Sequence, residues 1–373
     1  MFPSVGNGMN PALPGDIASG QEAVVPVRPG RARAGCGTTS TRFESAARGG
    51  SRGLLALWLL VFLSFFGMPD APAAEPLRLS VSLTPLSLPI FVAQRQGYFT
   101  AEGLALKVDE VIGGHRSLQQ VMEGSADLAT CSEAVVMFNS FQRQPYAVIA
   151  TFVTSDDDVK VITRADTGIT RPQQLVGKRI ATVVGSAGHY YLDTLLLLNG
   201  VDPKTVQVSN IQPEAMMEAL RQGKVDALSI WEPYPFKTLT TVPASRPLAK
   251  SGGYTENFNL IAHRRLIGVR DGDLVKLLRA LDHAQRFIKD EPLKAQAILR
   301  ERLHVDQSFI DWIWPRYNYR LTLAQSLLTT MEGEARWAVA EGYVAGKHSP
   351  NYLDFVYTKP LRQVRPGAVS IDD

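Results

Sequence analysis

The segment that decides the fold is SLQQVMEGSADLATCSE, residues 117–133, because EAMMEALRQGKVDALSIWE, residues 214–232, repeats its pattern. Both segments predict a helix, then a glycine, two further residues, an aspartate, and a strand that ends in polar residues. The corresponding residues, 99 positions apart, are Gly124 and Gly223, Asp127 and Asp226, and Glu133 and Glu232. A repeated α/β half predicts two similar lobes that face each other across a cleft. Such a cleft can close on a small ligand.

Outward from the repeat, the chain from residue 75 onward alternates predicted strands and helices. The first half is expected to be a βαβαβ unit with parallel strands, and the strand 258–262 is expected to return to the first lobe. Beyond that strand the pattern is helical, with predicted helices at 273–289, 293–303, 306–317 and 323–345. Large aromatic side chains in this region predict core packing rather than a cofactor site: Trp312, Trp314 and Trp337.

Residues 1–74 have the features of an export signal. Arg48 and Arg52 precede the apolar run Leu54–Phe66, whose length is typical of a secretory signal and too short to cross a bilayer. Small residues follow, so we expect cleavage near Ala73 or Ala74, with an uncleaved membrane anchor as the alternative. The stretch before the run, residues 1–50, has no hydrophobic period and predicts disorder.

The composition of residues 75–373 excludes some classes of partner. These residues carry 33 basic and 32 acidic side chains, and a near-neutral balance argues against a nucleic-acid partner. Cys131 is the single cysteine in this part, so no internal disulfide is expected. No cysteine follows the apolar run directly, so we expect a soluble, monomeric periplasmic protein without a lipid anchor.

Candidate binding residues follow from the rule that ligands lie beyond the carboxyl ends of parallel strands, at the N-termini of the next helices. Four predicted loops meet this description: Thr84–Leu88, Ser132–Glu133, Gly185–His189 and Trp231–Glu232. The candidate ligand contacts are Thr84, Ser87, Leu88, Ser132, Glu133, Thr154, Ser186, Ala187, Gly188, His189, Trp231 and Glu232. We identify no catalytic residue, no cofactor site and no metal-ligand spacing, and Asp156–Asp158 predicts a solvated turn between the lobes.

Several candidates have a second interpretation that the sequence leaves open. Ser132 and Ser186 are suited to cap helices as well as to contact a ligand. Trp231 is expected either to form a wall of the pocket or to pack between the lobes. His189 is expected either to donate to an anion or to face solvent.

The order of several motifs resembles the substrate-binding proteins of ABC importers for nitrate, sulfonates and taurine. The resemblance covers roughly residues 76–367. Its motifs are Gln94-Arg-Gln-Gly-Tyr-Phe99-x-x-Glu102-Gly-Leu104, Leu175-x-Gly-Lys-Arg179, Gly185-Ser-Ala-Gly-His189, Asn199-Gly-Val201, Gly223-Lys-Val-Asp-Ala227 with Trp231-Glu-Pro-Tyr234, Tyr352-Leu-Asp-Phe-Val356 and Val364-Arg-Pro366.

This resemblance implies a type II periplasmic binding fold, with two α/β lobes, a hinge and a central ligand cleft. We expect lobe 1 to comprise 75–154 and 256–373 and lobe 2 to comprise 155–255, with crossings near Thr151–Asp158 and Gly252–Asn259.

The implied function is a receptor that delivers a small ligand to a membrane permease with a cytoplasmic ATPase. The alternatives are a sensory binding protein and, less favoured, an enzyme resembling the pyrimidine-synthesising relatives. No lysine or arginine is prominent in the four loops, and Glu133 and Glu232 would suit an amino or ring N–H group. We therefore expect a small organic ligand, either sulfonate-like or heteroaromatic.

Overall fold

The computed structural model describes residues 75–142, 145–250 and 252–372, which belong to one compact unit, Pro72–Asp373. The predicted signal, its cleavage site and the predicted disorder of residues 1–50 lie outside these residues. Within the described part, no helix has the length and apolar character needed to cross a membrane.

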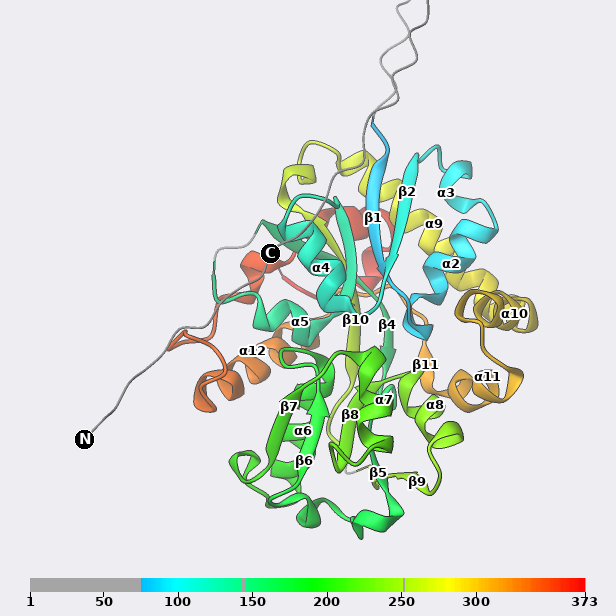
Figure 1. Cartoon of the computed structure of the whole chain (residues 1–373). Coiled ribbons are helices and arrows are strands. Elements are labelled where there is room, and N and C mark those ends of the chain that lie inside the picture. The colour runs from blue at the N-terminus through cyan, green and yellow to red at the C-terminus, as the bar shows by residue number, and fades with distance from the viewer. Residues whose placement is uncertain (1–74, 143–144, 251, 373) are drawn as a thin grey trace, which may run out of the picture. The chain divides into compact units, whose positions relative to one another are not determined.

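Two sheets organise the described residues (Figure 1). The first has the order β11-β4-β10-β3-β1-β2. Its strands are β1 (Leu77–Ser82), β2 (Leu106–Val111), β3 (Leu128–Ser132), β4 (Tyr146–Ser155), β10 (Glu256–His263) and β11 (Tyr317–Asn318). Strand β1 is parallel to β2 and β3, as expected, and β10 returns from the far end of the chain. It enters antiparallel between β3 and β4, so the first sheet is mixed rather than parallel throughout.

The second sheet has the order β7-β6-β8-β5-β9. Its strands are β5 (Val159–Arg164), β6 (Arg179–Thr182), β7 (Gln207–Asn210), β8 (Ala227–Trp231) and β9 (Ser245–Pro247). Here β6 is parallel to β7 and β8, while β5 is antiparallel to β8. The two sheets therefore repeat one arrangement, in which an antiparallel strand lies beside the repeated strand, β10 beside β3 and β5 beside β8.

Helices cover both sheets. Those around the first sheet are α2 (Leu88–Arg95), α3 (Tyr98–Ala101), α4 (Gly114–Met122), α5 (Glu133–Phe138), α9 (Asp271–Asp290), α10 (Pro292–Leu303), α11 (Gln307–Ile313), α12 (Gln325–Ala340) and α13 (Lys359–Val364). Those around the second are α6 (Ala187–Leu198), α7 (Pro213–Arg221) and α8 (Tyr234–Thr241). Each sheet has its own cluster of buried apolar side chains, and the three C-terminal tryptophans pack, partly buried, against the first cluster.

The predicted helix 306–317 is wrong at its end. Helix α11 stops at Ile313, and Pro315, which has no N–H to donate, occupies the first turn of a short 3-10 helix instead. Tyr317 and Asn318 then form β11, which pairs antiparallel with the end of β4.

The repeat is held in both halves by the same hydrogen bonds. Arg78, at the start of β1, donates from its backbone N and its Nε to Oδ2 of Asp127, at 2.9 and 3.0 Å, and from Nη2 to the carbonyl of Gly124 at 2.9 Å. Arg179 makes the same three bonds to Asp226 and Gly223, at 2.9, 3.1 and 2.8 Å. Gly124 and Gly223 have φ of 77° and 70°, which a glycine adopts without strain where the helix ends.

The chain passes between the sheets twice. The predicted crossings are too long, because Ser155 and Glu256 still pair within the first sheet. The connections are residues 156–158, from β4 to β5, and residues 248–255, from β9 to β10. We keep the lobe boundaries at 155 and 256 as a proposal. The first connection is not simply a solvated turn, because Asp156 is exposed while Asp158 is buried.

Candidate ligand-binding site

A narrow cavity, with a volume of about 20 Å³, lies where the two sheets meet. It is lined by Ser82, Thr84, Leu86, Gly114, His115, Ser132, Val135, Ser186, Ala187, Trp231, Glu256 and Phe258. Both lobes contribute, because Ser186, Ala187 and Trp231 belong to the part of the chain that builds the second sheet. A ligand held here would therefore touch both lobes at once.

The carboxyl ends of three parallel strands supply the polar and aromatic walls. Ser82 ends β1, Ser132 ends β3 and Trp231 ends β8. Thr84 follows β1, and Ser186 precedes α6. These positions agree with the general rule for ligand sites in open α/β sheets.

Two glycines allow helices to approach strands closely beside the cavity. A Cβ at Gly114 would lie 2.8 Å from Cα of Cys131, and one at Gly188 would lie 2.7 Å from the carbonyl oxygen of Ser229. The N-terminus of α4 is thereby placed against β3, and that of α6 against β8. These approaches bring His115 and Ala187 to the cavity wall.

Three residues that line the cavity, Thr84, His115 and Glu256, have buried side-chain atoms without a hydrogen-bond partner within the described residues. Oγ1 of Thr84, a residue only 1% exposed, makes no hydrogen bond there. Oε2 of Glu256, 3% exposed, accepts no N–H or hydroxyl hydrogen bond. The carboxyl of Asp158 lies near that of Glu256, and after burial its charge contributes most to raising the pKa of Glu256. Buried polar groups are nearly always satisfied, so these atoms leave hydrogen-bonding capacity for a ligand or an ordered water molecule.

The ring of His115 lies edge-on to that of Trp231, with centroids 6.4 Å apart and planes at 63°. Burial, with a further effect from Arg116, lowers the pKa of His115, so its imidazole is neutral at pH 7. The contact joins α4 of the first lobe to β8 of the second. Trp231 thus lines the cavity and also packs between the lobes.

The structure brings five of the twelve predicted contacts to the cavity: Thr84, Ser132, Ser186, Ala187 and Trp231. Ser132 and Ser186 occupy helix N-cap positions, but neither side chain makes a capping hydrogen bond. Oγ of Ser186 donates instead to the carbonyl of Val183 at 2.6 Å.

The other predicted contacts lie away from the cavity lining. Oγ of Ser87 donates to the carbonyl of Ser82 at 2.6 Å, and Leu88 is fully buried in the core. Thr154 lies on β4 between Asn257 and Asn318. Gly188 allows the N-terminus of α6 to lie close to β8.

His189 is buried, which excludes the solvent-facing alternative. Its ring stacks on Phe138 at 5.9 Å between centroids and lies 4.5 Å from that of Tyr343. Burial lowers its pKa to about 4, so the imidazole carries no charge with which to hold an anion at pH 7.

The two glutamates of the repeat are occupied by the protein's own groups. Oε1 of Glu232 accepts from Nε1 of Trp312 at 2.8 Å and lies 3.1 Å from Nζ of Lys160, and its Oε2 accepts from the backbone N of Phe236 at 3.1 Å. Oε2 of Glu133 accepts from the backbone N of Asn257 at 2.7 Å. Oε1 of Glu133 is buried without a hydrogen-bond partner among the described residues. Neither glutamate lines the cavity, and their contact with a ligand N–H group stays a prediction.

The other lining residues were not predicted from the sequence: Ser82, Leu86, Gly114, His115, Val135, Glu256 and Phe258. The pair Gly113-Gly114 after the second predicted strand was a usable signal for His115, because it obeys the same strand-end rule. Glu256 and Phe258 had no such signal. They open an antiparallel strand, whose amino end meets the carboxyl ends of its neighbours.

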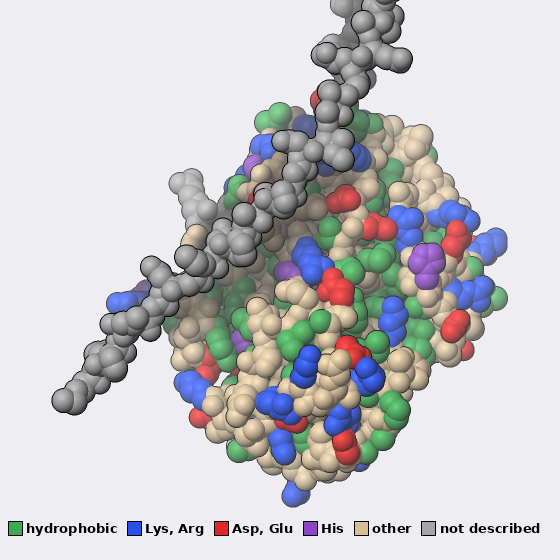
Figure 2. Space-filling model, viewed as in Figure 1, with side chains coloured by type: hydrophobic (Ala, Val, Ile, Leu, Met, Phe, Trp, Pro, Cys, Tyr) green, Lys and Arg blue, Asp and Glu red, His purple; other side chains and the backbone are tan. Residues whose placement is uncertain are grey.

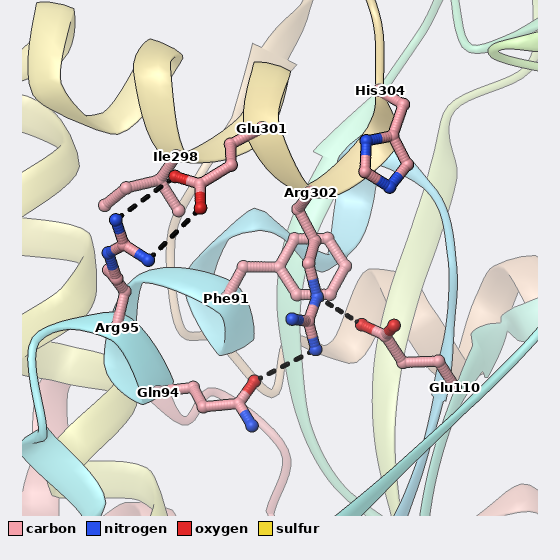
Figure 3. Close-up of a pocket in the computed structure, with 8 residues that line it drawn as sticks. All are labelled: Phe91, Gln94, Arg95, Glu110, Ile298, Glu301, Arg302 and His304. Carbon is pink, nitrogen blue, oxygen red and sulfur yellow. Dashed lines mark hydrogen bonds and ion pairs between the residues drawn. The ribbon is translucent and has the colours of Figure 1, made fainter.

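A wider groove of about 470 Å³ lies beside the first sheet, between α2, β2 and α10 (Figure 3). Its charged side chains pair with each other. Arg95 binds Glu301 at 3.2 Å, and Arg302 binds Glu110 at 2.6 Å while lying over the ring of Phe91 (Figure 3). No residue of the second sheet lines it, so lobe closure would not enclose a ligand there.

Other features of the described residues bear on the kind of site. The described residues include no group of three or more His, Cys, Asp or Glu side chains arranged to hold a metal ion. On the face drawn in Figure 2, basic and acidic side chains are interspersed.

Known proteins resemble this chain in sequence and in fold. The taurine-binding periplasmic protein of Escherichia coli (strain K12) is 24% identical over 176 residues, which cover 47% of this chain and 53% of that protein. The chain thus matches about half the length of this relative.

Two solved structures are similar over most of their length. The alkanesulfonate-binding protein SsuA from Xanthomonas axonopodis pv. citri, bound to MOPS, has a TM-score of 0.68 at 18% identity and covers 77% of this chain and 99% of that chain. The periplasmic aliphatic sulphonate binding protein SsuA from Escherichia coli has a TM-score of 0.64 at 16% identity, covering 76% and 92%. These matches confirm the predicted type II periplasmic binding fold. The family description "NMT1/THI5 like" matches residues 84–295, more than half of the chain, and the protein therefore belongs to that family.

Proposed function

We propose that this protein is the solute-binding receptor of an ABC importer and captures a small organic ligand in the cavity between its lobes. The observation that carries the proposal is the cavity itself, which both lobes line and which contains buried polar atoms without ordinary partners. Membership of the family and the relatives' names, which describe taurine and sulfonate binding, support the same role.

The mechanism is closure of the two lobes on the ligand. Contacts that need both lobes exist only in the closed state, so a ligand that makes them shifts the equilibrium toward closure. Direct contacts between the lobes already occur beside the cavity. Nη1 of Arg116 on α4 binds Oε1 of Glu214 on α7 at 2.6 Å, and Trp312 on α11 binds Glu232 after β8.

The proposed partners are membrane permease subunits with a cytoplasmic ATPase, and the proposed location is the periplasm, with cleavage near Ala73 or Ala74. We propose binding rather than catalysis. The thiol of Cys131 is fully buried, and burial raises its pKa well above the ordinary value, so it stays protonated and unreactive.

Ligand-induced thermal stabilisation tests the proposal. Native mass spectrometry of the purified protein would first identify any retained compound, and a melting-temperature screen of small sulfonates, amines and heteroaromatics would follow. The combined change Thr84→Val and Trp231→Ala removes one unpartnered hydroxyl and one wall of the cavity. We expect it to weaken binding at least about tenfold, which corresponds to roughly 1.4 kcal/mol.

Thr154→Val is the matched control, because Thr154 lies outside the cavity lining. It should bind like the unaltered protein. The proposal fails if no compound of the screen stabilises the protein, or if the control loses binding as strongly as the double variant.

A further inference from the structure

Four buried carboxyls form a continuous acidic cluster behind the cavity. Glu133 begins α5, Asp158 precedes β5, Glu256 begins β10 and Glu334 lies on α12. All four are at most 3% exposed. Asp158 is in side-chain contact with Glu256, and Glu133 with Glu334. We name these four residues the acidic cluster. Glu256 is the member that lines the cavity.

The positive charge near this cluster is used elsewhere. Nζ of Lys160 lies 3.1 Å from Glu232 and 3.7 Å from Asp157, and it donates to the carbonyl of Asp157. No lysine or arginine is among the described residues that line the cavity, and His115 is neutral there. An anionic ligand would thus meet a carboxyl without a compensating cation.

Because the acidic cluster is buried, its carboxyls hold their protons more tightly than exposed carboxyls do. Burial raises the pKa of Glu133 and of Asp158 to about 7, and it raises those of Glu256 and Glu334 well above the ordinary value. Protons bound to these carboxyls supply the compensating positive charge. A cation placed against Glu256 could supply that charge instead and release a proton.

The cavity also offers aromatic surfaces to a cation. Trp231 and Phe258 line it, and the edge of His115 lies against Trp231. Aromatic faces attract organic ammonium and guanidinium-type groups, most strongly where water is excluded. Because the described residues contain no grouping suited to a metal ion, an organic cation fits the cavity better than an inorganic one.

We propose that the ligand carries a positively charged nitrogen, an alkylammonium or amidinium group, which lies against Glu256 and the ring of Trp231. The hydroxyl of Thr84 is free to bond the rest of the molecule. This inference rests on the proposed receptor function and narrows its ligand: a molecule that is only an anion, such as a simple sulfonate, is disfavoured.

Matched probe pairs test the proposal on the full-length mature protein. Taurine and isethionate share a sulfonate and differ in having an ammonium or a hydroxyl group. Benzamidine and benzenesulfonate share a ring and differ in charge. Isothermal titration should show that the nitrogen-bearing member of each pair binds at least about tenfold more tightly, because a charge-assisted hydrogen bond is lost in the other.

The pH dependence provides a test that needs no variant. The titratable and charged groups around Glu256 are Asp158, Glu133, Glu334, Lys160, Glu232, His115, Cys131, Tyr254 and Tyr317. An ammonium ligand prefers the deprotonated cluster, so its affinity should rise between pH 5 and pH 8. An anion would show the opposite trend. Titration in buffers of different ionisation enthalpy should report proton release on binding of the amine.

Glu256→Gln removes the charge and keeps the size of the side chain. We expect it to abolish the preference within each probe pair and the proton release. The matched control is Asp193→Asn, because Asp193 is also a buried acid but lies outside the cavity and pairs with Tyr343 at 3.0 Å. This control should keep both properties.

Two outcomes separate the present inference from the proposed function. If both members of each pair bind equally, or if isethionate and benzenesulfonate bind more tightly, the receptor function stands and the cationic ligand is refuted. If neither these probes nor the wider screen of compounds binds, the receptor function itself is refuted. Preference for the nitrogen-bearing members, lost in Glu256→Gln alone, supports the inference.

Discussion

The repeat relates two pairs of acidic residues in the two halves of the molecule. The aspartates of one pair share the same arginine hydrogen bonds, whereas the glutamates of the other pair have different partners. Asp127 and Asp226 each accept the same bonds from an arginine that opens the neighbouring strand. Glu133 and Glu232, also related by the repeat, have different surroundings. Glu133 lies in the acidic cluster, whereas Glu232 pairs with Lys160.

The difference follows from where the partners come from. The arginine that each aspartate pairs with in both halves lies inside the repeated unit, on its first strand, and only Asp127 has a further partner, Arg265, from outside it. The partners of the glutamates lie outside it: Asn257 on β10 and Glu334 on α12 for one, and Lys160 on β5 and Trp312 on α11 for the other. A repeat therefore conserves local architecture, while the chemistry at the lobe interface depends on segments that are not repeated.

The largest effect that would sharpen this comparison concerns the two glutamates. Glu232→Gln leaves Lys160, which is only 8% exposed, without its nearest carboxylate, so we expect a loss of about 3 kcal/mol in the free energy of unfolding. Glu133→Gln replaces a carboxyl that is already partly protonated at pH 7, so it should change stability by no more than about 1 kcal/mol. Urea unfolding measures both. Equal losses would show that the two positions are equivalent after all.

The next effect concerns glycines that each half uses to bring a helix against a strand. Gly188→Ala and Gly114→Ala place a Cβ within 3 Å of backbone atoms, so each should cost about 2 kcal/mol through forced displacement. Gly272→Ala on α9 is the control, because nothing lies within 4 Å of its Cβ position, and it should be neutral or slightly stabilising. The melting temperatures of the three variants measure these losses of stability. If only one of Gly188→Ala and Gly114→Ala lowers the melting temperature, the half that carries the other glycine relaxes around the added methyl group.

The distinction between local patterns and distant strand pairings also explains which parts of the fold and of the cavity lining could be predicted from the sequence. The repeated glycine and aspartate stand at fixed places in a local pattern of helix, turn and strand, and this pattern identified both, although Arg78 and Arg179 lie 49 and 47 residues from the aspartates. Thr84, Ser132 and Trp231 were predicted from the rule that ligands bind at strand ends in such sheets, and all three line the cavity. Glu256 was not predicted, because its position depends on the insertion of β10 between β3 and β4. The paired residues of these strands lie more than 100 positions apart in the sequence. No local periodicity encodes that pairing.

A smaller change in stability tests whether Asp127 and Asp226 are equivalent. Asp127 also pairs with Arg265, from outside the repeat, and it is less exposed than Asp226, with side chains 11% and 22% exposed. Asp127→Asn should therefore cost about 1.5 kcal/mol and Asp226→Asn about 1 kcal/mol, after allowance for solvent screening. Adding Arg265→Gln should remove most of the difference in a double-mutant cycle. If Asp226→Asn proved the more costly change, the external arginine would not be what separates the halves.

The smallest expected effect is a difference in pH dependence between the two kinds of carboxyl. Hydrogen bonds from Arg78 and Arg265 outweigh burial and hold the pKa of Asp127 below its ordinary value, so its contribution to stability is lost only as pH falls below about 4. Burial raises the pKa of Glu133 to about 7, so its contribution is present below about pH 4 and is lost as pH rises toward 7.

Glu133→Gln should therefore become more stable relative to the unaltered protein, by roughly 1 kcal/mol, between pH 5 and pH 7.5. The difference between variant and unaltered protein is the quantity to measure, because the lowered pKa values of His115 and His189 act in the opposite direction in both proteins and cancel. Asp127→Asn should show no such change over this range, since Asp127 stays ionised throughout. A flat difference for Glu133→Gln would mean that its carboxyl is ionised in the folded protein, and the acidic cluster would then need positive charge from a source other than protons.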